Sequence, residues 1–406
     1  MPALPPPIPA GPDDAERRRL LMRAGRYAAA VATLSACGGG SDAGTPGTPP
    51  PPPPPGPPPV ITPVVTGLQQ PWSLAFLPDG SALVTEKAGQ LRRVSTTGDV
   101  SSPISGVPAV FYMTNSQGGL LDVVLDPNFA SNRRIYLSYA EPDQGGGLTG
   151  AATAVARAVL SADHTSLSQV TVIYRQTPRF NGDGHFGCRL AFRPSDGTLF
   201  VTLGDRQTNT DAPQRTDNHL GKVVRIDTNG GNPGNNFSGL IWSRGHRNPQ
   251  GAAIHPDTGE LWISEHGPLG GDEINRVVQG GNYGWPLKSY GCNYGQTPSE
   301  ACRIGGGTHA PTFVEPVHYW VPISCAPAGM CFYTGDRFPE WRGNLFVGTM
   351  ADQRSLRRIT LNGNAFAGEE QLFRSLNVRV RDIKQGPDGW LYLLEESNGR
   401  ILRIHR

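Results

Sequence analysis

The chain has 406 residues, of which 52 are glycine, 39 are proline and 17% are charged. This length allows one large domain or two ordinary ones, and the abundance of turn-forming residues favours an all-β protein over a helical one. Lys and Arg together number 36 against 34 acidic residues, which gives a formal net charge of +2. This balance offers no bulk electrostatic basis for binding nucleic acid or a membrane surface.

The N-terminal segment is predicted to be a targeting sequence. A basic run from Arg17 to Arg26 precedes the apolar stretch 27–36, which is far shorter than the roughly 20 residues that span a bilayer. This arrangement is typical of a signal peptide, and it ends in Leu34-Ser-Ala-Cys37, which resembles a bacterial lipobox. We expect residues 1–37 to be a signal peptide and lipidated Cys37 to anchor a periplasmic protein. A soluble periplasmic or secreted protein and a cytoplasmic protein are the alternatives.

A linker is expected after the signal peptide. Residues 38–60 are rich in Gly, Ser, Thr and Pro, and the run Pro49–Pro55 favours extended polyproline II over helix or sheet. This segment would hold the following domain, residues 61–406, away from the anchor. Met22 is an alternative start site, and residues 1–21 would then be an upstream extension.

The cysteines are compatible with an oxidising compartment. Cys292 and Cys302 lie ten residues apart, and Cys325 and Cys331 lie six apart, so two short-loop disulfides are predicted. Cys188 is left over and is expected to be a buried small residue. No Cys-x-x-Cys pair is present, which disfavours a cysteine-bound metal and an attached haem. Electrons from any redox reaction would therefore leave to a separate acceptor.

A repeat dominates the rest of the chain. Each copy has a hydrophobic strand, a Pro-Asp-Gly-like turn and a second hydrophobic strand, which is the pattern of a β-hairpin. The copies begin at Leu74, Val123, Leu190, Ala253, Phe338 (a degenerate copy) and Ile383. Copies at this spacing, with no sustained helical periodicity, predict an all-β fold: a six-bladed β-propeller of four-stranded antiparallel blades.

Two of the four polar clusters beside these strands could transfer or stabilise charge. His185 lies in the glycine-flanked loop Asn181–Gly187, and Asp205 follows the paired strand, so the imidazole could act as a general base that the carboxylate orients. Arg247 and Asn248 offer several hydrogen-bond donors to carbonyl or carboxylate oxygens. A turn-stabilising His–Asp pair and a solvated Arg beside an Asn-Pro turn are the structural alternatives.

The other two clusters suggest ligands of opposite charge. The segment Glu265–Glu273 combines a Gly-Pro turn with carboxylates, which are oxygen ligands that suit Ca²⁺, although the spacing is not that of an EF-hand. Arg379 and Arg381 alternate, so both guanidinium groups share one face of a strand and could bind a polyanion. A metal-free glycine turn and a solvated pair on an edge strand remain the alternatives.

In this order, the clusters resemble those of the soluble quinoprotein glucose and aldose sugar dehydrogenases. The resemblance covers residues 62–406 and is closer to the broad-specificity aldose branch. It is carried by Gln117–Leu121, His185–Gly187, Leu203–Asp205, Gly245–Gly251, Glu265–Pro268, Asn282–Pro286 and Arg379–Asp382.

The resemblance implies oxidation of an aldose at the anomeric carbon to the lactone, with pyrroloquinoline quinone (PQQ) as cofactor. His185 would be the general base, Asp205 would polarise it, and Arg247 would stabilise charge on the reduced cofactor. The residues implied in PQQ binding are Gln117, Arg247, Asn248, Tyr294, Arg379 and Arg381. The carbonyls of Gly267 and Pro268 would hold a cofactor-associated Ca²⁺, and Glu273 with the carbonyl of Tyr283 a structural one.

One departure from the family bears on cofactor affinity. Ala351 aligns with a position where the family carries a lysine near the cofactor, and Arg354 is a candidate replacement. The rival functions are a non-enzymatic binding propeller on the cell surface and, less favoured, a calcium-dependent lactonase. The sequence leaves the sugar, the electron acceptor and the choice between monomer and homodimer open.

Overall fold

The computed structural model describes residues 56–143, 150–208, 210–352 and 354–406. The predicted signal peptide, the lipobox and most of the linker lie outside the described residues. Within the described part, no helix is both long and apolar enough to cross a membrane.

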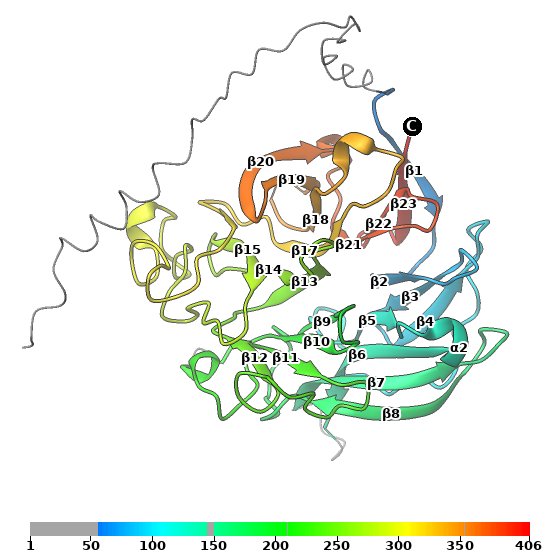
Figure 1. The fold of residues 1–406 in the computed structure, drawn as a ribbon, viewed down its shortest axis with the longest axis horizontal. Coiled ribbons are helices and arrows are strands. Elements are labelled where there is room, and N and C mark those ends of the chain that lie inside the picture. The colour runs from blue at the N-terminus through cyan, green and yellow to red at the C-terminus, as the bar shows by residue number, and fades with distance from the viewer. Residues whose placement is uncertain (1–55, 144–149, 209, 353) are drawn as a thin grey trace, which may run out of the picture. The chain divides into compact units, whose positions relative to one another are not determined.

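The described residues form six antiparallel sheets, five with four strands and one with three (Figure 1). The predicted six-bladed propeller is therefore confirmed. We number the sheets as blade 1 (β2–β4), blade 2 (β5–β8), blade 3 (β9–β12), blade 4 (β13–β16), blade 5 (β17–β20) and blade 6 (β21–β23 with β1).

The strands of blades 1 to 3 are β2 (Pro71–Phe76), β3 (Ala82–Glu86), β4 (Gln90–Val94), β5 (Leu120–Leu125), β6 (Arg134–Pro142), β7 (Ala151–Leu160), β8 (Leu167–Arg175), β9 (Gly187–Phe192), β10 (Leu199–Leu203), β11 (Lys222–Ile226) and β12 (Ile241–Arg244). Those of blades 4 to 6 are β13 (Pro249–Ile254), β14 (Leu261–Glu265), β15 (Asp272–Val277), β16 (His318–Trp320), β17 (Pro327–Phe332), β18 (Leu345–Thr349), β19 (Leu356–Asn362), β20 (Ala365–Leu372), β21 (Val380–Gln385), β22 (Leu391–Glu395), β23 (Arg400–His405) and β1 (Val60–Val65). The helical turns are α2 (Phe129–Asn132), η1 (Ala212–Gln214), η2 (Glu300–Cys302), η3 (Pro339–Trp341) and η4 (Arg374–Leu376).

The first strands of the blades surround the centre of the propeller. In the order β2, β5, β9, β13, β17 and β21, each contacts the next, and β21 contacts β2. These strands converge in the middle of Figure 1. In blade 1 the turn Pro78-Asp-Gly80 joins the first two strands as predicted: Asp79 Oδ1 accepts the Ser81 N–H at 2.9 Å, and Gly80 has φ +84°. The degenerate copy at Phe338 is offset, because it begins after β17 and supplies only η3 and β18.

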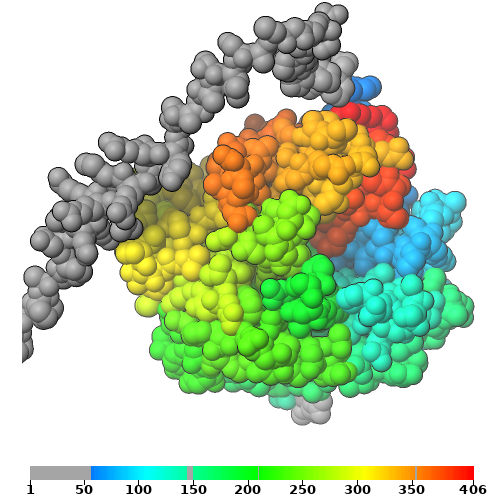
Figure 2. Space-filling model, in the orientation of Figure 1, coloured from blue at the N-terminus to red at the C-terminus, as the bar shows by residue number. Residues whose placement is uncertain are grey.

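The two ends of the domain meet in blade 6. Strand β1 pairs antiparallel with β23, with Val60 opposite His405, and forms the outer edge of the blade. In Figure 2 the blue N-terminal and red C-terminal sectors of the domain adjoin. Strand β1 begins at Val60, and its pairing with β23 closes the ring.

Hydrophobic clusters fill the wedges between neighbouring blades. One cluster combines Leu83 and Leu91 of blade 1 with Leu120, Val123 and Leu137 of blade 2, all fully buried. Burying a side chain of this size contributes about 1.5–3 kcal/mol. Because the blade faces are used for packing, polar residues that act on a ligand lie at the strand ends.

The cysteines fulfil the prediction in part. Cys292 and Cys302 form the expected disulfide, whereas Cys325 and Cys331 are free thiols, so the second predicted disulfide is wrong. The prediction assumed a loop, but Cys331 lies in β17, and a strand rises about 3.3 Å per residue, which separates cysteines six apart too far for a bond. Cys188 is buried as predicted, and burial raises the pKa of its thiol to about 12.

Candidate active site

The predicted site residues gather at one end of the propeller ring. Gln117, His185, Asn248 and Arg379 all lie within three residues before the first strand of a blade, while Asp205 lies two residues after a second strand. In an antiparallel pair, the start of one strand and the end of the next occupy the same edge. The topology therefore brings residues from blades 2, 3, 4 and 6 to one side of the central channel.

His185 and Asp205 form a buried pair. His185 Nδ1 lies 2.6 Å from Asp205 Oδ1, and the side chains are 6% and 3% exposed. Asp205 Oδ1 also accepts the Gln207 N–H at 2.9 Å, and Oδ2 accepts the Trp285 indole N–H at 2.7 Å. Burial lowers the pKa of His185 below its ordinary value of 6.5, against the opposing effect of Asp205. The imidazole is thus neutral at pH 7, with Nδ1–H toward the carboxylate and a lone pair on Nε2.

A residue that sequence reasoning missed holds the His185 loop. Arg206 is 1% exposed, and its guanidinium donates to the carbonyls of Gly184 (2.9 Å), Gly182 (2.7 Å) and Ala151 (2.7 Å). The His185 backbone, at φ +48°, donates to Gln117 Oε1 at 2.9 Å. These bonds stabilise the left-handed backbone and fix the position of the imidazole.

Arg247 and Asn248 lie beside the pair, on blade 4. The Arg247 backbone N–H donates to Glu265 Oε2 at 2.9 Å, and its guanidinium donates to the Gly267 carbonyl (2.7 Å) and the Tyr294 hydroxyl (2.9 Å). Arg247 Nε is buried and has no hydrogen-bond partner among the described residues. Asn248 Oδ1 accepts the backbone N–H at Gly187, 3.3 Å away, which links blades 3 and 4.

A cationic cavity of about 280 Å³ opens at the same end of the ring. Its lining residues are Gln70, Trp72, Lys87, Thr114, Asn115, Ser116, Gln117, Gln250, His266, Met350, Arg379, Arg381 and Glu396. Both predicted arginines pair with Glu396, at 3.0 Å from Arg379 and 2.9 Å from Arg381. Burial alone would raise the pKa of Glu396, but Arg381 and Arg379 outweigh it and lower that pKa to about 2.

Sequence reasoning missed Lys87, Gln250, His266 and Glu396 in this cavity. Burial lowers the pKa of Lys87 to about 8, with Arg381 adding to the effect, and burial and Arg247 lower that of His266 to about 3. A signal was available: Lys87, His266 and Glu396 each directly follow the second strand of a blade, close to the place that Asp205 occupies in blade 3.

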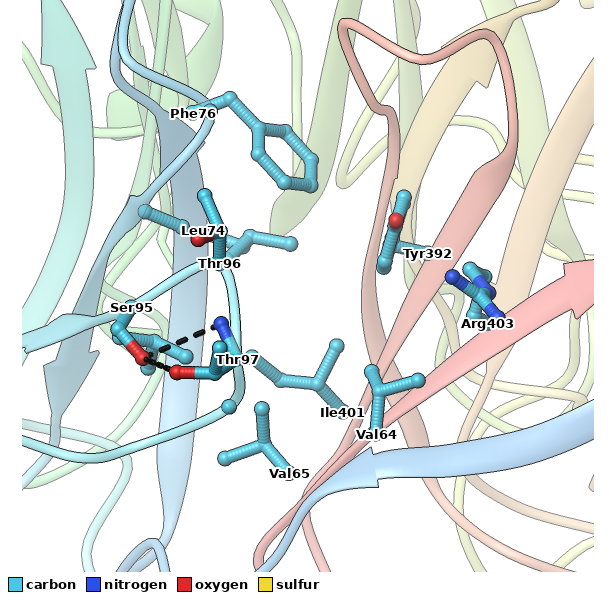
Figure 3. Close-up of a pocket in the computed structure, with 14 residues that line it drawn as sticks. Val64, Val65, Leu74, Phe76, Ser95, Thr96, Thr97, Tyr392, Ile401 and Arg403 are labelled. Carbon is cyan, nitrogen blue, oxygen red and sulfur yellow. Dashed lines mark hydrogen bonds between the residues drawn. The ribbon is translucent and has the colours of Figure 1, made fainter.

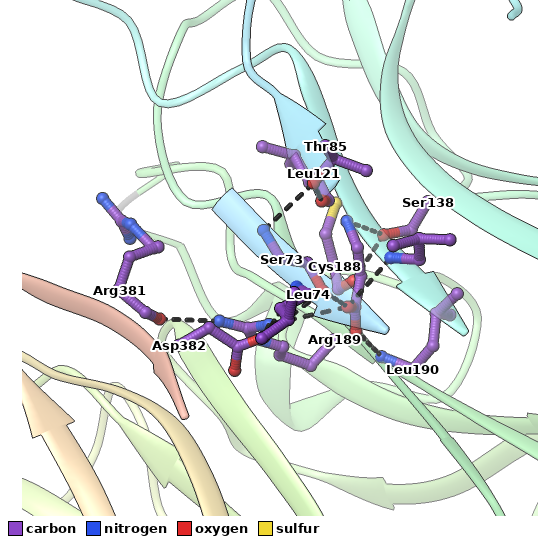
Figure 4. Close-up of polar contacts among 12 residues, drawn as sticks. Ser73, Leu74, Thr85, Leu121, Ser138, Cys188, Arg189, Leu190, Arg381 and Asp382 are labelled. Carbon is purple, nitrogen blue, oxygen red and sulfur yellow. Dashed lines mark hydrogen bonds and ion pairs between the residues drawn. The ribbon is translucent and has the colours of Figure 1, made fainter. Parts of the chain in front are cut away.

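Beneath the cavity, Arg189 joins four blades in a buried network (Figure 4). Its guanidinium lies 3.5 Å from Asp122 and 3.3 Å from Asp382, and it donates to the Arg381 carbonyl at 2.8 Å. A further bond, also 2.8 Å, goes to the Gln250 carbonyl. Arg189 therefore supports the backbone of two cavity residues from below.

A much smaller cavity contains most of the predicted metal ligands. Gly267, Glu273 and Tyr283 line a space of about 10 Å³ together with Glu265, but Pro268 does not contribute to its wall. Burial and the neighbouring Glu265 raise the pKa of Glu273 well above its ordinary value of 4.5. Nowhere in the described part of the chain do three His, Cys, Asp or Glu side chains form a metal-binding group.

Three other predicted features lie apart from the cationic cavity. Tyr294 is 70% exposed and contacts Arg247 instead of lining that cavity. Ala351 does not line it either, and neither does Arg354, which is exposed. Met350, the neighbour of Ala351, does.

A second sizeable cavity, of about 210 Å³, lies between blades 1 and 6 (Figure 3). Apolar side chains such as Leu74, Phe76 and Ile401 dominate its wall, with Arg403 and Tyr392 at one side. It has no histidine or carboxylate, so it offers no general base.

Residues 68–403 match the family described as Glucose / Sorbosone dehydrogenase. Aldose sugar dehydrogenase YliI of Escherichia coli (strain K12) is 42% identical over 348 residues, which cover 83% of this chain and 90% of the relative. A solved structure titled "Crystal structure of glucose dehydrogenase" is 42% identical, with a TM-score of 0.79, and covers 86% of this chain and 99% of its own. The PQQ-bound aldose sugar dehydrogenase from Streptomyces coelicolor is 27% identical, with a TM-score of 0.68 over 86% of this chain and 99% of that one.

Proposed function

Because this chain belongs to the glucose/sorbosone dehydrogenase family, we propose that it is a PQQ-dependent aldose sugar dehydrogenase that oxidises the anomeric carbon to the lactone. The observation that carries the proposal is the position of the pair of neutral His185 and ionised Asp205 at the same end of the ring as a cavity lined by Arg379 and Arg381. A base and a polyanion site on one side of the channel suit a sugar and a carboxylated quinone.

The proton transfer follows from the hydrogen bonds of His185. Asp205 accepts Nδ1–H, so Nε2 keeps its lone pair and can take the proton of the anomeric hydroxyl. The carboxylate then stabilises the imidazolium that forms. Bound PQQ would supply the acceptor for the hydride that leaves the anomeric carbon. Burial of both side chains keeps bulk water from competing for the proton.

The residues present fit PQQ. The Nε atoms of Arg247 and Arg381 are buried without a hydrogen-bond partner in the described part of the chain, and an anionic or carbonyl ligand would satisfy them. Arg379, Arg381 and Gln117 would bind the carboxylates, and Arg247 and Asn248 the quinone oxygens, with Arg247 stabilising negative charge. Tyr294 would contact the cofactor from its exposed position.

We also propose that calcium binds beside Arg247. The small cavity has about the volume of one water or one ion, and two buried carboxylates face it. This volume suits one ion, the structural calcium that Glu273 and the Tyr283 carbonyl would bind. The carbonyls of Gly267 and Pro268 would hold the cofactor-associated ion outside this cavity, because Pro268 does not line it. A divalent cation there would offset the repulsion that raises the pKa of Glu273.

The protein is proposed to work in the periplasm, anchored by lipid at Cys37, as a monomer or homodimer. It would pass its electrons to a separate acceptor, since it carries no haem-attachment motif.

Reconstitution tests the function. The apoprotein is given PQQ and Ca²⁺, and reduction of an electron-accepting dye is followed with glucose and several other aldoses. Activity should require both additions and should fall by at least about 10²-fold in His185→Ala, the lower range of general-base contributions. If the wild type binds PQQ but does not oxidise any of the sugars, the proposed aldose oxidation is refuted. If it does not bind PQQ at all, the quinoprotein proposal is refuted and a binding propeller is favoured.

A further inference from the structure

The backbone of Lys87 is held between two blades. Lys87 directly follows β3, its N–H donates to the Gln70 carbonyl at 3.2 Å, and its own carbonyl accepts the Leu120 N–H at 3.0 Å. A Cβ at Gly119 would lie 2.1 Å from the Lys87 carbonyl oxygen, so the start of blade 2 packs directly against this residue. The position of the Lys87 side chain is therefore set by the ring itself.

The Lys87 side chain lies in the wall of the cationic cavity and is buried. Its ammonium donates one hydrogen bond, at 2.7 Å, to the Ser116 carbonyl. An ammonium group has three N–H donors, and Lys87 makes no other hydrogen bond or ion pair within the described ranges of the chain. Two donors of a buried cation thus lack an acceptor on the protein.

The charges around the Lys87 ammonium do not balance. The cavity wall contains three cations, Lys87, Arg379 and Arg381, against the single carboxylate of Glu396. His266, which also faces the cavity, is neutral because burial and Arg247 lower its pKa to about 3. The cavity therefore has an excess of two positive charges, which favours an anion with more than one charge.

We propose that Lys87 is a third anchor for the cofactor, pairing directly with a carboxylate of PQQ and making cofactor affinity depend on pH. This inference rests on the proposed function. Lys87 belongs to blade 1, whereas Ala351 follows β18 of blade 5. On this proposal Lys87 supplies, from another blade, the cation that the family resemblance implies at the position of Ala351.

The pH dependence follows from the state of the empty cavity. Burial, Arg381 and Arg379 lower the pKa of Lys87 to about 8, while Glu396 opposes them. A bound carboxylate stabilises the ammonium and raises the pKa of Lys87 in the complex. PQQ affinity is therefore highest below pH 8, and it falls as the pH rises from 8 to the pKa that Lys87 has in the complex. The charged and titratable groups that face Lys87 are Arg379, Arg381, Glu396 and His266. Glu396 and His266 have pKa values of about 2 and about 3, so neither exchanges a proton over this interval.

The test measures PQQ binding without sugar, by quenching of tryptophan fluorescence between pH 6.5 and 9.5. Lys87→Met should weaken binding about 10- to 100-fold at pH 7, the loss expected for one charge-assisted bond, and should remove the pH dependence. Lys87→Arg should retain affinity near wild type and show no decline up to pH 9.5. Arg93→Met, which removes a half-buried cation from β4 of the same blade and outside the cavity wall, should leave binding unchanged.

Calorimetry adds a readout that does not depend on affinity. In buffers of different ionisation enthalpy at pH 8.5, the wild type should take up roughly three-quarters of a proton per PQQ bound, because this is the fraction of Lys87 that is neutral in the empty cavity at that pH. Lys87→Met should take up none. Wild-type binding that Lys87→Met leaves unchanged in strength and pH dependence would overturn this inference and leave the dehydrogenase proposal intact. Failure of the wild type to bind PQQ would overturn both.

Discussion

Replacing Asp205 with asparagine tests whether this carboxylate makes His185 a base. The carboxylate accepts three hydrogen bonds: from His185 at 2.6 Å, from Gln207 at 2.9 Å and from Trp285 at 2.7 Å. An asparagine amide has only one oxygen, so either of its two orientations turns an N–H group toward a donor. If the NH₂ group faces Trp285, His185 keeps its tautomer but loses the negative charge beside it. If the NH₂ group faces His185, the imidazole must carry its proton on Nε2 and can no longer accept one.

These two orientations bound the size of the effect. Loss of one charge-assisted hydrogen bond costs about 1.5–3 kcal/mol, or roughly 10- to 100-fold in rate. Loss of the whole general-base contribution costs about 10²- to 10⁴-fold. We therefore expect kcat of Asp205→Asn to fall by about 10²- to 10⁴-fold, with PQQ affinity within about threefold of wild type because Asp205 does not line the cationic cavity.

The pH profile separates this role from a structural one. Burial lowers the pKa of His185 and Asp205 raises it, so removal of the charge lowers that pKa further. The loss of activity on the acidic side of neutrality should consequently begin at lower pH in Asp205→Asn than in the wild type. Trp285→Phe is the matched control, because it removes one donor and keeps the carboxylate, and its kcat should change by less than about tenfold. A rate for Asp205→Asn within tenfold of wild type, with an unmoved acidic limb, would refute the reasoning.

Two further predictions concern stability. Arg189→Met removes the cation that the buried carboxylates of Asp122 and Asp382 share, and only Asp382 keeps another one, Lys384 at 3.4 Å. Urea titration should show a loss of about 3–5 kcal/mol in the free energy of unfolding, against less than about 1 kcal/mol for the half-buried Arg193→Met, and equal losses would contradict the network. Glu396 has a pKa of about 2, below its ordinary 4.5, so it stabilises the fold above pH 4.5 and that stability disappears as pH falls toward 2. In Glu396→Gln the free energy of unfolding should fall by about 3 kcal/mol less between pH 4.5 and pH 2 than in the wild type. If the variant and the wild type lose the same free energy of unfolding over this range, the pKa of Glu396 is not depressed.

The repeat made the fold predictable. Alternating apolar residues around Asp-Gly turns predict β-hairpins, which depend only on local sequence. The number of copies of the repeat equals the number of blades. The sequence does not show that β1, at the start of the domain, completes the sheet that begins with β21, since that pairing joins residues more than 300 positions apart. The degenerate copy at Phe338 predicts one hairpin, but its first half forms the 3-10 turn η3, Pro339–Trp341, instead of a strand.

The site was predictable where its residues belong to glycine-rich motifs. His185 and Arg247 are conspicuous in this way, but Lys87 and Glu396 follow ordinary strands and look like surface charges. Their burial depends on the neighbouring blade, as the contact of Gly119 with the Lys87 backbone shows. Arg189 was missed for a related reason: an arginine in a hydrophobic strand is read as exposed, whereas this one is compensated by carboxylates from two other blades.

The architecture explains why one end of the ring can combine a base with an anion site. Asp205 raises the pKa of His185, whereas Arg247 lowers it, so cations close to the imidazole must be few and well placed. The propeller separates the two functions by blade: the pair belongs to blade 3, while Arg379 and Arg381 belong to blade 6 and Lys87 to blade 1. Because β1 completes blade 6, the start of the domain belongs to the same blade as Arg379 and Arg381.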